Sequence, residues 1–396
     1  MHIAVFIYSL RGGGAQKRAV TLACGFADRG HKVDLLVVSS DSSRGVPLSP
    51  GVNVIALDRG WRRGLDKLNG RVNVRGLLTA SVIPMLARYL RTSRPDVLLS
   101  AASHVNLVAA AARRMSGADV TLVLRASNYP SGNIGSWPAL ELAVRKWLRR
   151  TVGRVYPWAD HIIAVSNGVG EGIRELTGMS KDRVTTIYSP IVEPEIERLA
   201  AAPVDHPWAN DPGVPLLLGV GRLTVQKDVP TLLRAFARVR AARPARLVFL
   251  GEGRQRARLE QLIREMGLEA DVALVGRVDN PFAWFSKASV FVLSSAWEGL
   301  PGVVIEALAC GCPIVSTDCP SGPREILDEG RLGPLVAVRD DKGLAEAILS
   351  VLDAPLDRAT LVAGADRFRI DPAVDNYVEL LTAQVAKRKA QSRSAH

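Results

Sequence analysis

The sequence has few cysteines and no long apolar run. Its 396 residues contain four cysteines, at positions 24, 310, 312 and 319, which is too few for a disulfide framework. The spacing of Cys310 and Cys312 does not match a zinc ribbon, so reduced thiols and no metal site are expected. No stretch reaches the roughly 18 apolar residues of a membrane-spanning helix, and the first residues lack the pattern of a signal peptide. These absences predict a cytoplasmic protein, or one that lies on the inner face of the membrane without crossing it.

Composition indicates a globular protein with an uneven distribution of charge. Hydrophobic residues make up 47% and charged residues 23% of the chain, and at about 150 residues per domain the length predicts two or three domains. The net charge is +12. Residues 1–150 hold 22 Lys and Arg against 8 Asp and Glu, whereas residues 151–396 hold 29 against 31. The basic part is therefore expected to face an anionic partner, such as nucleic acid, a phospholipid surface or a phosphorylated substrate.

Strand-like and helical segments alternate in two series. The first series has strands expected at 3–8, 32–38, 52–57, 97–100, 120–124, 161–165 and 184–187, and a helix at 15–29 that ends at Gly30. The second has strands at 216–220, 246–250, 272–275, 290–293 and 313–316, each followed by a helical segment. Apolar strands separated by helices predict parallel sheets that are covered on both faces.

This α/β pattern predicts two doubly wound, Rossmann-like domains that face a central cleft. Residues 1–190 would form an N-terminal domain and residues 191–214 an interdomain linker. Residues 215–371 would form a C-terminal domain, followed by a helix and basic tail at 372–396. In such sheets, ligands bind to loops at the carboxyl ends of the strands, so functional residues are expected there.

A glycine-containing loop follows the first strand. Gly12, Gly13 and Gly14 would let a ligand approach the backbone at a helix N-terminus, where free N–H groups and the helix dipole favour an anion. Lys17 occupies the position where a dinucleotide fingerprint needs its third glycine, which argues against a nicotinamide cofactor. A tight turn without any ligand explains these glycines equally well.

Two basic residues follow the first strand of the second series. Arg222 and Lys227 lie five positions apart, just before a helix that is expected to begin at Asp228. The planar fork of an arginine and the point charge of a lysine suit the two ends of a pyrophosphate. The alternative is that both are solvated turn residues and that Asp228 caps the helix.

The segment 294–306 carries the most specific pattern. Glu298 follows a buried strand, residues 299–302 expose backbone N–H groups before a helix, and Glu306 follows eight positions after Glu298. Backbone amides hold phosphate or sugar oxygens, and carboxylates accept hydrogen bonds from sugar hydroxyls. The alternative for Glu306 is an exposed residue of the first helical turn, favoured by the helix dipole.

The two glutamates, with seven residues between them, resemble the signature of the retaining glycosyltransferases of family four, which have the two-domain GT-B fold. Four further segments are similar to family segments and occur in the expected order: Gly13-Gly14-Ala15, Gly221 to Asp228, Gly251-Glu252-Gly253 and Gly322-Pro323-Arg324-Glu325-Ile326. The resemblance covers nearly the whole chain and is weakest at about residues 60–160. The segment 318–325 also resembles bacterial members that extend lipid-linked saccharides and surface polysaccharides.

The resemblance implies that the N-terminal domain binds the acceptor and the C-terminal domain the donor, and it implies roles for individual residues. Arg222 and Lys227 would neutralise the donor diphosphate, Glu306 would accept the ribose hydroxyls, and Glu298 would hold the transferred sugar. Arg222, Lys227 and Glu298 are the expected catalytic residues. The implied donor-binding residues are Gly13, Gly14, Arg222, Lys227, Glu298, Gly299, Leu300, Pro301, Gly302 and Glu306. Similar members need no metal, and this sequence has no Asp-x-Asp triplet, so no cofactor is implied beyond the nucleotide-sugar substrate.

The chain departs from the resemblance after the strand at 120–124. Many relatives have a histidine there, where this sequence has Arg125, Ser127 and Asn128. Arg125, Asn128 and His104, the nearest preceding histidine, are the candidates for the acceptor side. His104 lies in an alanine-rich segment, where a packed or capping role is the alternative.

The segment 137–158 combines apolar and basic residues at helical spacing. Its apolar stripe consists of Leu140, Val144, Trp147, Leu148, Val152 and Val155, and its basic residues are Arg145, Lys146, Arg149, Arg150 and Arg154. Such a helix can lie in a membrane interface, or its stripe can pack on the domain's own sheet. A second basic segment spans 59–75. An acceptor linked to a diphosphate lipid at an anionic membrane would account for both segments.

Together these features predict a metal-independent, retaining glycosyltransferase. Its donor is expected to be a UDP-sugar, and its acceptor a saccharide linked to a polyprenyl diphosphate. A nucleotide-sugar epimerase of the same architecture is the alternative and would turn over the donor alone. A basic nucleic-acid-binding protein would explain the charge but not Glu298 and Glu306 beside phosphate loops, so no nucleic-acid partner is expected.

Overall fold

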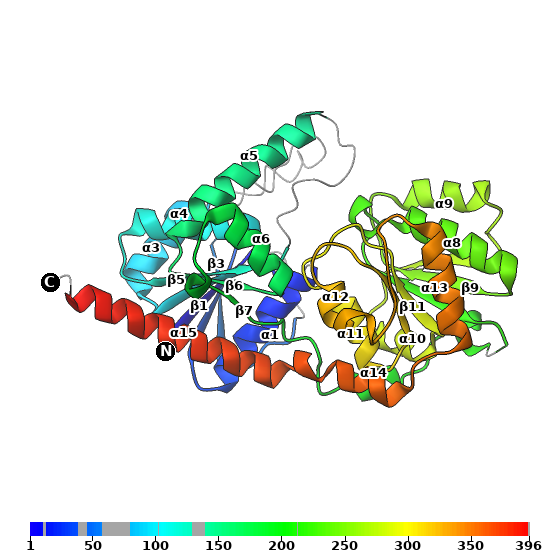
Figure 1. Ribbon diagram of the computed structural model, residues 1–396. Coiled ribbons are helices and arrows are strands. Elements are labelled where there is room, and N and C mark those ends of the chain that lie inside the picture. Colours follow the sequence, from blue (N-terminus) through cyan, green and yellow to red (C-terminus); the bar gives the residue numbers. More distant parts are fainter. Residues whose placement is uncertain are drawn as a thin grey trace. The chain divides into compact units, whose positions relative to one another are not determined.

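The structure is a computed structural model and describes residues 1–10, 13–38, 46–57, 80–101, 103–128, 139–211 and 213–394. The chain divides into two compact units, Met1–Pro190 with Ile370–His396, and Ile191–Arg369. Each unit contains one parallel sheet flanked by helices (Figure 1). The expected class, two doubly wound α/β domains, is therefore confirmed.

In the first unit, seven strands of the described residues form one sheet in the order β3-β2-β1-β4-β5-β6-β7. The strands are β1 (His2–Ile7), β2 (Lys32–Val37), β3 (Val52–Ala56), β4 (Val97–Ala101), β5 (Thr121–Ala126), β6 (His161–Ala164) and β7 (Val184–Thr186). The helices are α1 (Gly14–Asp28), α3 (Ile83–Ser93), α4 (Ser103–Ser116), α5 (Ala139–Val155), α6 (Asn167–Thr177) and α15 (Ile370–Ser394). The inner strands are buried on both faces, which explains their continuous apolar runs.

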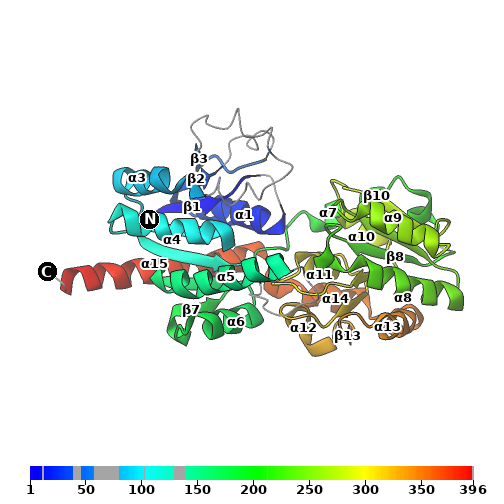
Figure 2. The ribbon, with the colours of Figure 1, turned by 90° about the horizontal axis from the view of Figure 1, so that it is seen from above.

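The C-terminal helix is a structural part of the first unit. Leu22 and Phe26 of α1 and Tyr377 and Leu381 of α15 are fully buried in the same core cluster as the strands. Burying one such side chain contributes about 1.5–3 kcal/mol. The expected helix and tail form one long helix over Ile370–Ser394 in the described residues, which packs on the first sheet, beside α1 (Figures 1 and 2).

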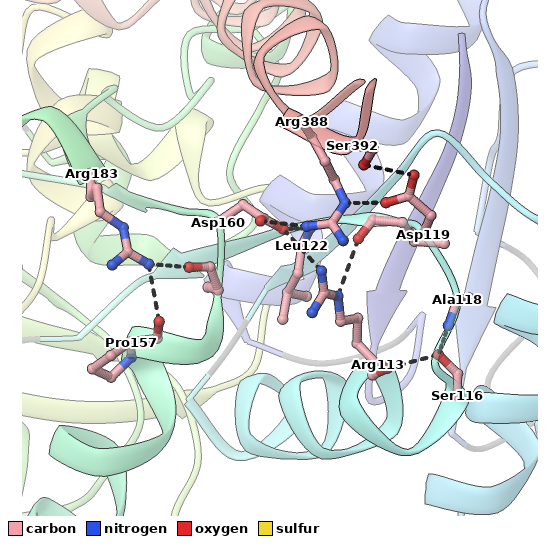
Figure 3. A network of polar contacts seen from close by, with 12 residues as sticks. Arg113, Ser116, Ala118, Asp119, Leu122, Pro157, Asp160, Arg183, Arg388 and Ser392 are labelled. Carbon is pink, nitrogen blue, oxygen red and sulfur yellow. Dashed lines mark hydrogen bonds and ion pairs between the residues drawn. The ribbon is translucent and has the colours of Figure 1, made fainter. Parts of the chain in front are cut away.

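Ion pairs fix the end of α15 to the amino-terminal edge of that sheet (Figure 3). Arg388 donates to Asp119 and Asp160, both at 2.7 Å, and Asp160 also accepts the backbone N–H of Leu122 at 2.7 Å. Lys389 contacts Asp96 at 2.8 Å. Part of the basic tail is therefore neutralised within the unit, which the sequence does not reveal.

His161, at the start of β6, is a buried imidazole. It is 2% exposed, its Nε2 lies 2.9 Å from Thr185 Oγ1, and its Nδ1 has no hydrogen-bond partner among the described residues. Burial, followed by the charges of Lys387 and Arg183, lowers the pKa of His161 to about 4, whereas a nearby Asp182 opposes this shift.

The expected result is a loss of stability in acid that a His161→Gln variant does not share. Because the pKa is about 6.5 in the unfolded chain and about 4 in the folded chain, protons bind the unfolded state preferentially between these values. Stability is unaffected above pH 6.5 and falls by up to about 3 kcal/mol by pH 4, at about 1.4 kcal/mol per pKa unit. Urea unfolding midpoints of both proteins at pH 7.5 and 4.5 measure the difference. Equal acid losses in the two proteins would contradict it.

In the second unit, six strands of the described residues form a sheet in the order β10-β9-β8-β11-β12-β13. The strands are β8 (Leu216–Val220), β9 (Arg246–Leu250), β10 (Val272–Gly276), β11 (Val290–Leu293), β12 (Ile314–Thr317) and β13 (Leu335–Val336). The helices are α7 (Ile196–Ala200), α8 (Val229–Ala242), α9 (Arg256–Glu265), α10 (Phe282–Lys287), α11 (Gly302–Ala309), α12 (Pro323–Ile326), α13 (Asp341–Asp353) and α14 (Arg358–Gly364). Helices α8 and α13 lie side by side and share one core cluster with the strands (Figures 1 and 2).

Two features of the second unit differ from the sequence pattern. The two-residue strand β13 was not expected, because so short a strand has no detectable periodicity. The stretch 191–214 belongs to this unit and includes α7 and a 3₁₀ turn at Pro207–Asn210. Asn280 and Ser286 donate to the carbonyls of Leu199 and Ala200, so α7 is tied to the sheet domain rather than extended as a linker.

Candidate functional site

Two loops meet at the carboxyl edge of the second sheet. Strands β8 and β11 are parallel neighbours, with Leu217 opposite Val290. The loops that follow them, residues 221–228 and 294–301, therefore start side by side, where parallel sheets bind ligands. These loops carry Arg222, Lys227 and Glu298.

Lys227 and Glu298 form a nearly buried ion pair. Nζ of Lys227 lies 2.7 Å from Oε1 of Glu298, and the two side chains are 15% and 10% exposed. Each charge is therefore compensated by the other within the protein. The sequence placed both residues in one site, but not in contact with each other.

Hydrogen bonds join the two loops on either side of this pair. The N–H of Ala296 donates to the carbonyl of Gln226 at 2.8 Å, and Ser294 Oγ donates to the carbonyl of Lys227 at 2.8 Å. Gln226 Nε2 donates to the carbonyl of Trp297 at 3.0 Å and to Glu298 Oε2 at 3.3 Å. Gln226 and Ser294 were not expected as site residues. The only sequence signal for them was their position on the two loops.

Arg222 is exposed, in contrast to Lys227. Its guanidinium makes no hydrogen bond or ion pair with another part of the chain that the structure describes. Asp228 occupies the residue before α8, but its carboxylate accepts from the hydroxyl of Thr231 at 2.8 Å and not from a helix N–H. The loop thus presents one buried, compensated cation and one exposed cation.

The loop before α11 is supported by a neighbouring turn. The N–H of Glu298 lies 3.4 Å from the carbonyl of Pro320, and Ser321 Oγ donates to the carbonyl of Gly299 at 2.8 Å. Gly322 has a φ of +98°, and a Cβ there would lie 2.5 Å from Pro301 Cδ. The glycine after Ser321 is therefore required by close packing against this loop.

The described backbone places the remaining residues of the pattern around the start of α11. Gly299 and Pro301 are buried, whereas Leu300 and Gly302 are partly exposed. Glu306 is half-buried and lies in the second turn of the helix. The alternative explanation of Glu306 as a first-turn residue favoured by the helix dipole therefore does not apply.

Gly13 and Gly14 begin α1 in the first unit. Gly13 is the N-cap residue, with a φ of −75° that any residue can adopt. A Cβ built on Gly13 or on Gly14 meets no atom of the described residues within 4 Å. Neither backbone conformation nor packing against described residues explains the glycine at position 13, and the space in front of it is open.

We expect Gly13→Ala to weaken donor binding without destabilising the protein. The new methyl group causes no clash, and alanine lowers the entropy of the unfolded chain, so the melting temperature should stay equal or rise slightly. If the glycine leaves room for a diphosphate, the KM for the donor should rise about tenfold. Thermal melting and steady-state kinetics on one preparation measure both effects. An unchanged KM would show that the turn alone explains this residue.

Two of the three acceptor-side candidates, Arg125 and Asn128, have side chains in the described part of the chain. Arg125 is 1% exposed, and its guanidinium donates to Tyr377, Ser127 and Ser189 at 3.0, 2.8 and 2.6 Å. A buried guanidinium with three protein partners is not available to a ligand in this structure. Asn128 is exposed at the end of the described segment, and the side chain of His104 lies outside the described residues.

Helix α5 presents a basic face that includes an aromatic residue. Lys146, Arg149, Arg150 and Arg154 are exposed, and none of them forms an ion pair with a described residue. Trp147 is 64% exposed on the same side and so departs from the expected apolar stripe, whereas Val152 is buried. The basic segment at 59–75 lies outside the described residues.

The cysteines and acidic residues carry no further site. Burial raises the pKa of Cys310 to about 12 and that of Cys312 further, so both remain protonated thiols at neutral pH. No group of three or more His, Cys, Asp and Glu in the described ranges has the arrangement of a metal site. None of the helices that the described residues form is long and apolar enough to cross a bilayer.

Family models match both parts of the chain. Residues 12–192 match the model described as Glycosyltransferase Family 4, and residues 214–354 match Glycosyl transferases group 1. A curated relative from Campylobacter jejuni, N-acetylgalactosamine-N,N'-diacetylbacillosaminyl-diphospho-undecaprenol 4-alpha-N-acetylgalactosaminyltransferase, is 28% identical over 356 residues, 89% of this chain and 90% of the relative. The lipopolysaccharide 1,6-galactosyltransferase of Salmonella typhimurium is 26% identical over 303 residues, 74% of this chain and 77% of the relative.

Solved structures share the fold over nearly the whole chain. The apo form of the lipopolysaccharide outer core galactosyltransferase WaaB has a TM-score of 0.70 at 20% identity, covering 97% of this chain and 100% of that one. Anabaena HepE in complex with UDP and glucose has a TM-score of 0.72 at 19% identity, covering 96% of this chain and 99% of that one. At these identities the similarity is one of fold.

Proposed function

Because this chain belongs to the retaining glycosyltransferases of family 4 and has their GT-B fold, we propose that it moves a sugar from UDP to a lipid-linked saccharide. The observation that carries the donor part is the Lys227–Glu298 pair beside the exposed Arg222, at the carboxyl edge of the second sheet. A UDP donor is supported by HepE, which shares the fold and whose structure contains UDP and glucose.

The proposed donor site uses positive charge and backbone amides. Arg222 and Lys227 would contact the diphosphate and stabilise the negative charge that develops on UDP as it leaves. Glu298, with the backbone around 299–302, would contact the transferred sugar, and Glu306 the ribose hydroxyls. Gly13 and Gly14 would leave room for the diphosphate on the side of the first unit. Arg222, Lys227 and Glu298 are the proposed catalytic residues, and no metal ion takes part in this proposal.

Thermal melting in the presence of donors tests this proposal. The full chain is melted with UDP-, GDP- and ADP-sugars and with NAD(H), each well above its expected Kd. A ligand that binds only the folded state at 100 times its Kd stabilises it by about 2.7 kcal/mol, which raises the melting temperature by a few degrees. A shift with a UDP-sugar supports the proposal. A shift with NAD(H) alone would contradict it, and conversion of the donor alone into an epimer would favour the epimerase.

The proposed acceptor is a saccharide on a polyprenyl diphosphate, at an anionic membrane surface on the cytoplasmic side. The name of the Campylobacter jejuni relative includes a diphospho-undecaprenol acceptor. The exposed cations of α5, with Trp147 among them, are suited to contact such a surface, because each contributes about 1 kcal/mol near anionic lipids.

We expect removal of three α5 charges to abolish binding to anionic vesicles. A variant with Lys146, Arg149 and Arg150 all changed to glutamine should lose about 3 kcal/mol of binding, a more than hundredfold lower partition coefficient. Flotation with phosphatidylserine-containing vesicles measures this, and the wild-type protein should also dissociate at high salt.

The matched control removes three exposed arginines from the second unit. Changing Arg254, Arg258 and Arg264 to glutamine alters the net charge equally, and none of these residues forms an ion pair with a described residue. This control should float like the wild-type protein. Equal losses in both triple variants would show that net charge, and not α5, drives binding.

A further inference from the structure

Two side chains to which the sequence analysis gave no role, Ser295 and Gln226, hold the Lys227–Glu298 pair. Ser295 is fully buried and donates to Oε1 of Glu298 at 2.7 Å, the oxygen that Lys227 contacts at the same distance. Gln226 Nε2 lies at the longer distance of 3.3 Å from Oε2. The two oxygens of the carboxylate therefore differ, since Oε1 accepts two short hydrogen bonds and Oε2 accepts one long hydrogen bond.

Both supporting residues are themselves fixed by the protein. The carbonyl of Ser295 accepts from Thr317 Oγ1 at 2.7 Å, and the carbonyl of Gln226 accepts from the N–H of Ala296 at 2.8 Å. Gln226 Nε2 also donates to the carbonyl of Trp297 at 3.0 Å. Rotation of the Glu298 carboxylate would break its short, charge-assisted bonds, so it has one preferred orientation.

We infer that Gln226 and Ser295 are positioning residues of the donor site, which orient Glu298 so that Oε1 holds Lys227 and Oε2 keeps accepting capacity. The identity of the ligand, a nucleotide sugar, rests on the proposed function. The lysine ammonium group is carried on a flexible stem of four carbons. Fixing this group before the ligand binds removes the conformational-entropy cost of ordering it from the free energy of binding. Because Oε2 of Glu298 accepts only one long hydrogen bond, it still has a lone pair that can accept a hydrogen bond from a ligand.

The first test needs no ligand. Full-length wild-type, Ser295→Ala, Ser295→Thr and Gln226→Met proteins are treated with an amine-acetylating ester, and acetylation of Lys227 is followed by mass spectrometry. The rate should rise about tenfold in Ser295→Ala and Gln226→Met, which is the effect of one lost hydrogen bond to a charged group. It should return toward the wild-type rate in Ser295→Thr, which keeps the hydroxyl. Lys342, whose side chain is 75% exposed, is the internal control and should not change.

The second test asks whether Ser295 acts through Glu298. The Kd of UDP-glucose, or of the UDP-sugar that shifts the melting temperature, is measured by calorimetry in wild-type and Glu298→Gln backgrounds. Ser295→Ala should raise the Kd about tenfold in the wild-type background and less than twofold in the Glu298→Gln background. This non-additivity, which shows that Ser295 and Glu298 are coupled, is a result that a purely structural role would not produce.

The outcomes separate this inference from the proposed function. Unchanged acetylation of Lys227 in both Ser295→Ala and Gln226→Met, or equal losses of affinity in both backgrounds, would overturn the positioning role. Faster acetylation in a protein that binds no nucleotide sugar would support the positioning of Lys227 and overturn the proposed donor instead.

Discussion

Lys227→Met is expected to lower kcat/KM for the donor by about a hundredfold to a thousandfold, the effect of removing one group that stabilises developing negative charge. It should also destabilise the protein, because Glu298 would remain nearly buried without its cation. Breaking a buried ion pair costs about 3 kcal/mol or more. Methionine keeps the apolar stem, which packs against Gly221. Steady-state kinetics and urea unfolding measure the two effects.

A second substitution separates the two effects of Lys227. Combining Lys227→Met with Glu298→Gln removes the uncompensated charge, so stability should largely return while activity stays low.

Arg222→Ala should lower donor affinity with no loss of stability, because this side chain is exposed. Lys342→Ala, a substitution on the exposed surface of the second unit, should change neither quantity. Full activity in Lys227→Met would exclude a role for this lysine in transfer.

Gly251→Ala is expected to give the largest loss of stability. Gly251 has a φ of +143°, and a Cβ there would lie 1.8 Å from the carbonyl oxygen of Gly221. That atom belongs to the backbone of the loop that carries Arg222 and Lys227, so relief of the clash must move the loop. We expect more than about 4 kcal/mol of destabilisation, the range of severe steric and backbone effects. The urea midpoint of the full chain measures it.

Gly267→Ala is the matched control for backbone conformation. Gly267 also has a positive φ, of +64°, but a Cβ there meets no atom within 4 Å. Its cost should be about 1–2 kcal/mol, that of the left-handed conformation alone. If Gly251→Ala were as stable as Gly267→Ala, the loop at Gly251 and the loop at Gly221 could separate without a cost in stability.

The sequence predicted most strands and the loops that follow them, because these features depend on local chain composition. Buried parallel strands are short apolar runs, and helices between them interrupt the runs with a different period. The position of a loop after a strand also follows from order along the chain. The order of strands and loops along the chain therefore predicts that Arg222, Lys227 and Glu298 lie at one edge of the second sheet.

Contacts between distant segments could not be predicted in this way. Arg125 looked like a loop residue facing a ligand, but Tyr377, which lies 252 positions away, accepts its hydrogen bond in the core. Trp147 had the spacing of an apolar stripe, but the face that packs was set by neighbours on other elements. The sequence does not show that Arg388 and Lys389, at the end of α15, form ion pairs with carboxylates next to strands of the first sheet.

Residue types at fixed spacings are sufficient to predict the fold class, the family and the loops of the proposed donor site. Which charges remain available, and which side chains of the neighbouring loop hold Glu298, depends on contacts in the folded chain. Gln226 and Lys227 contact Glu298 from a loop that lies 71 or 72 positions earlier in the chain, and strand pairing between β8 and β11 brings the two loops together. Ser295, by contrast, reaches Glu298 within one loop. Charge compensation depends on distance in space, which spacing along one loop does not encode.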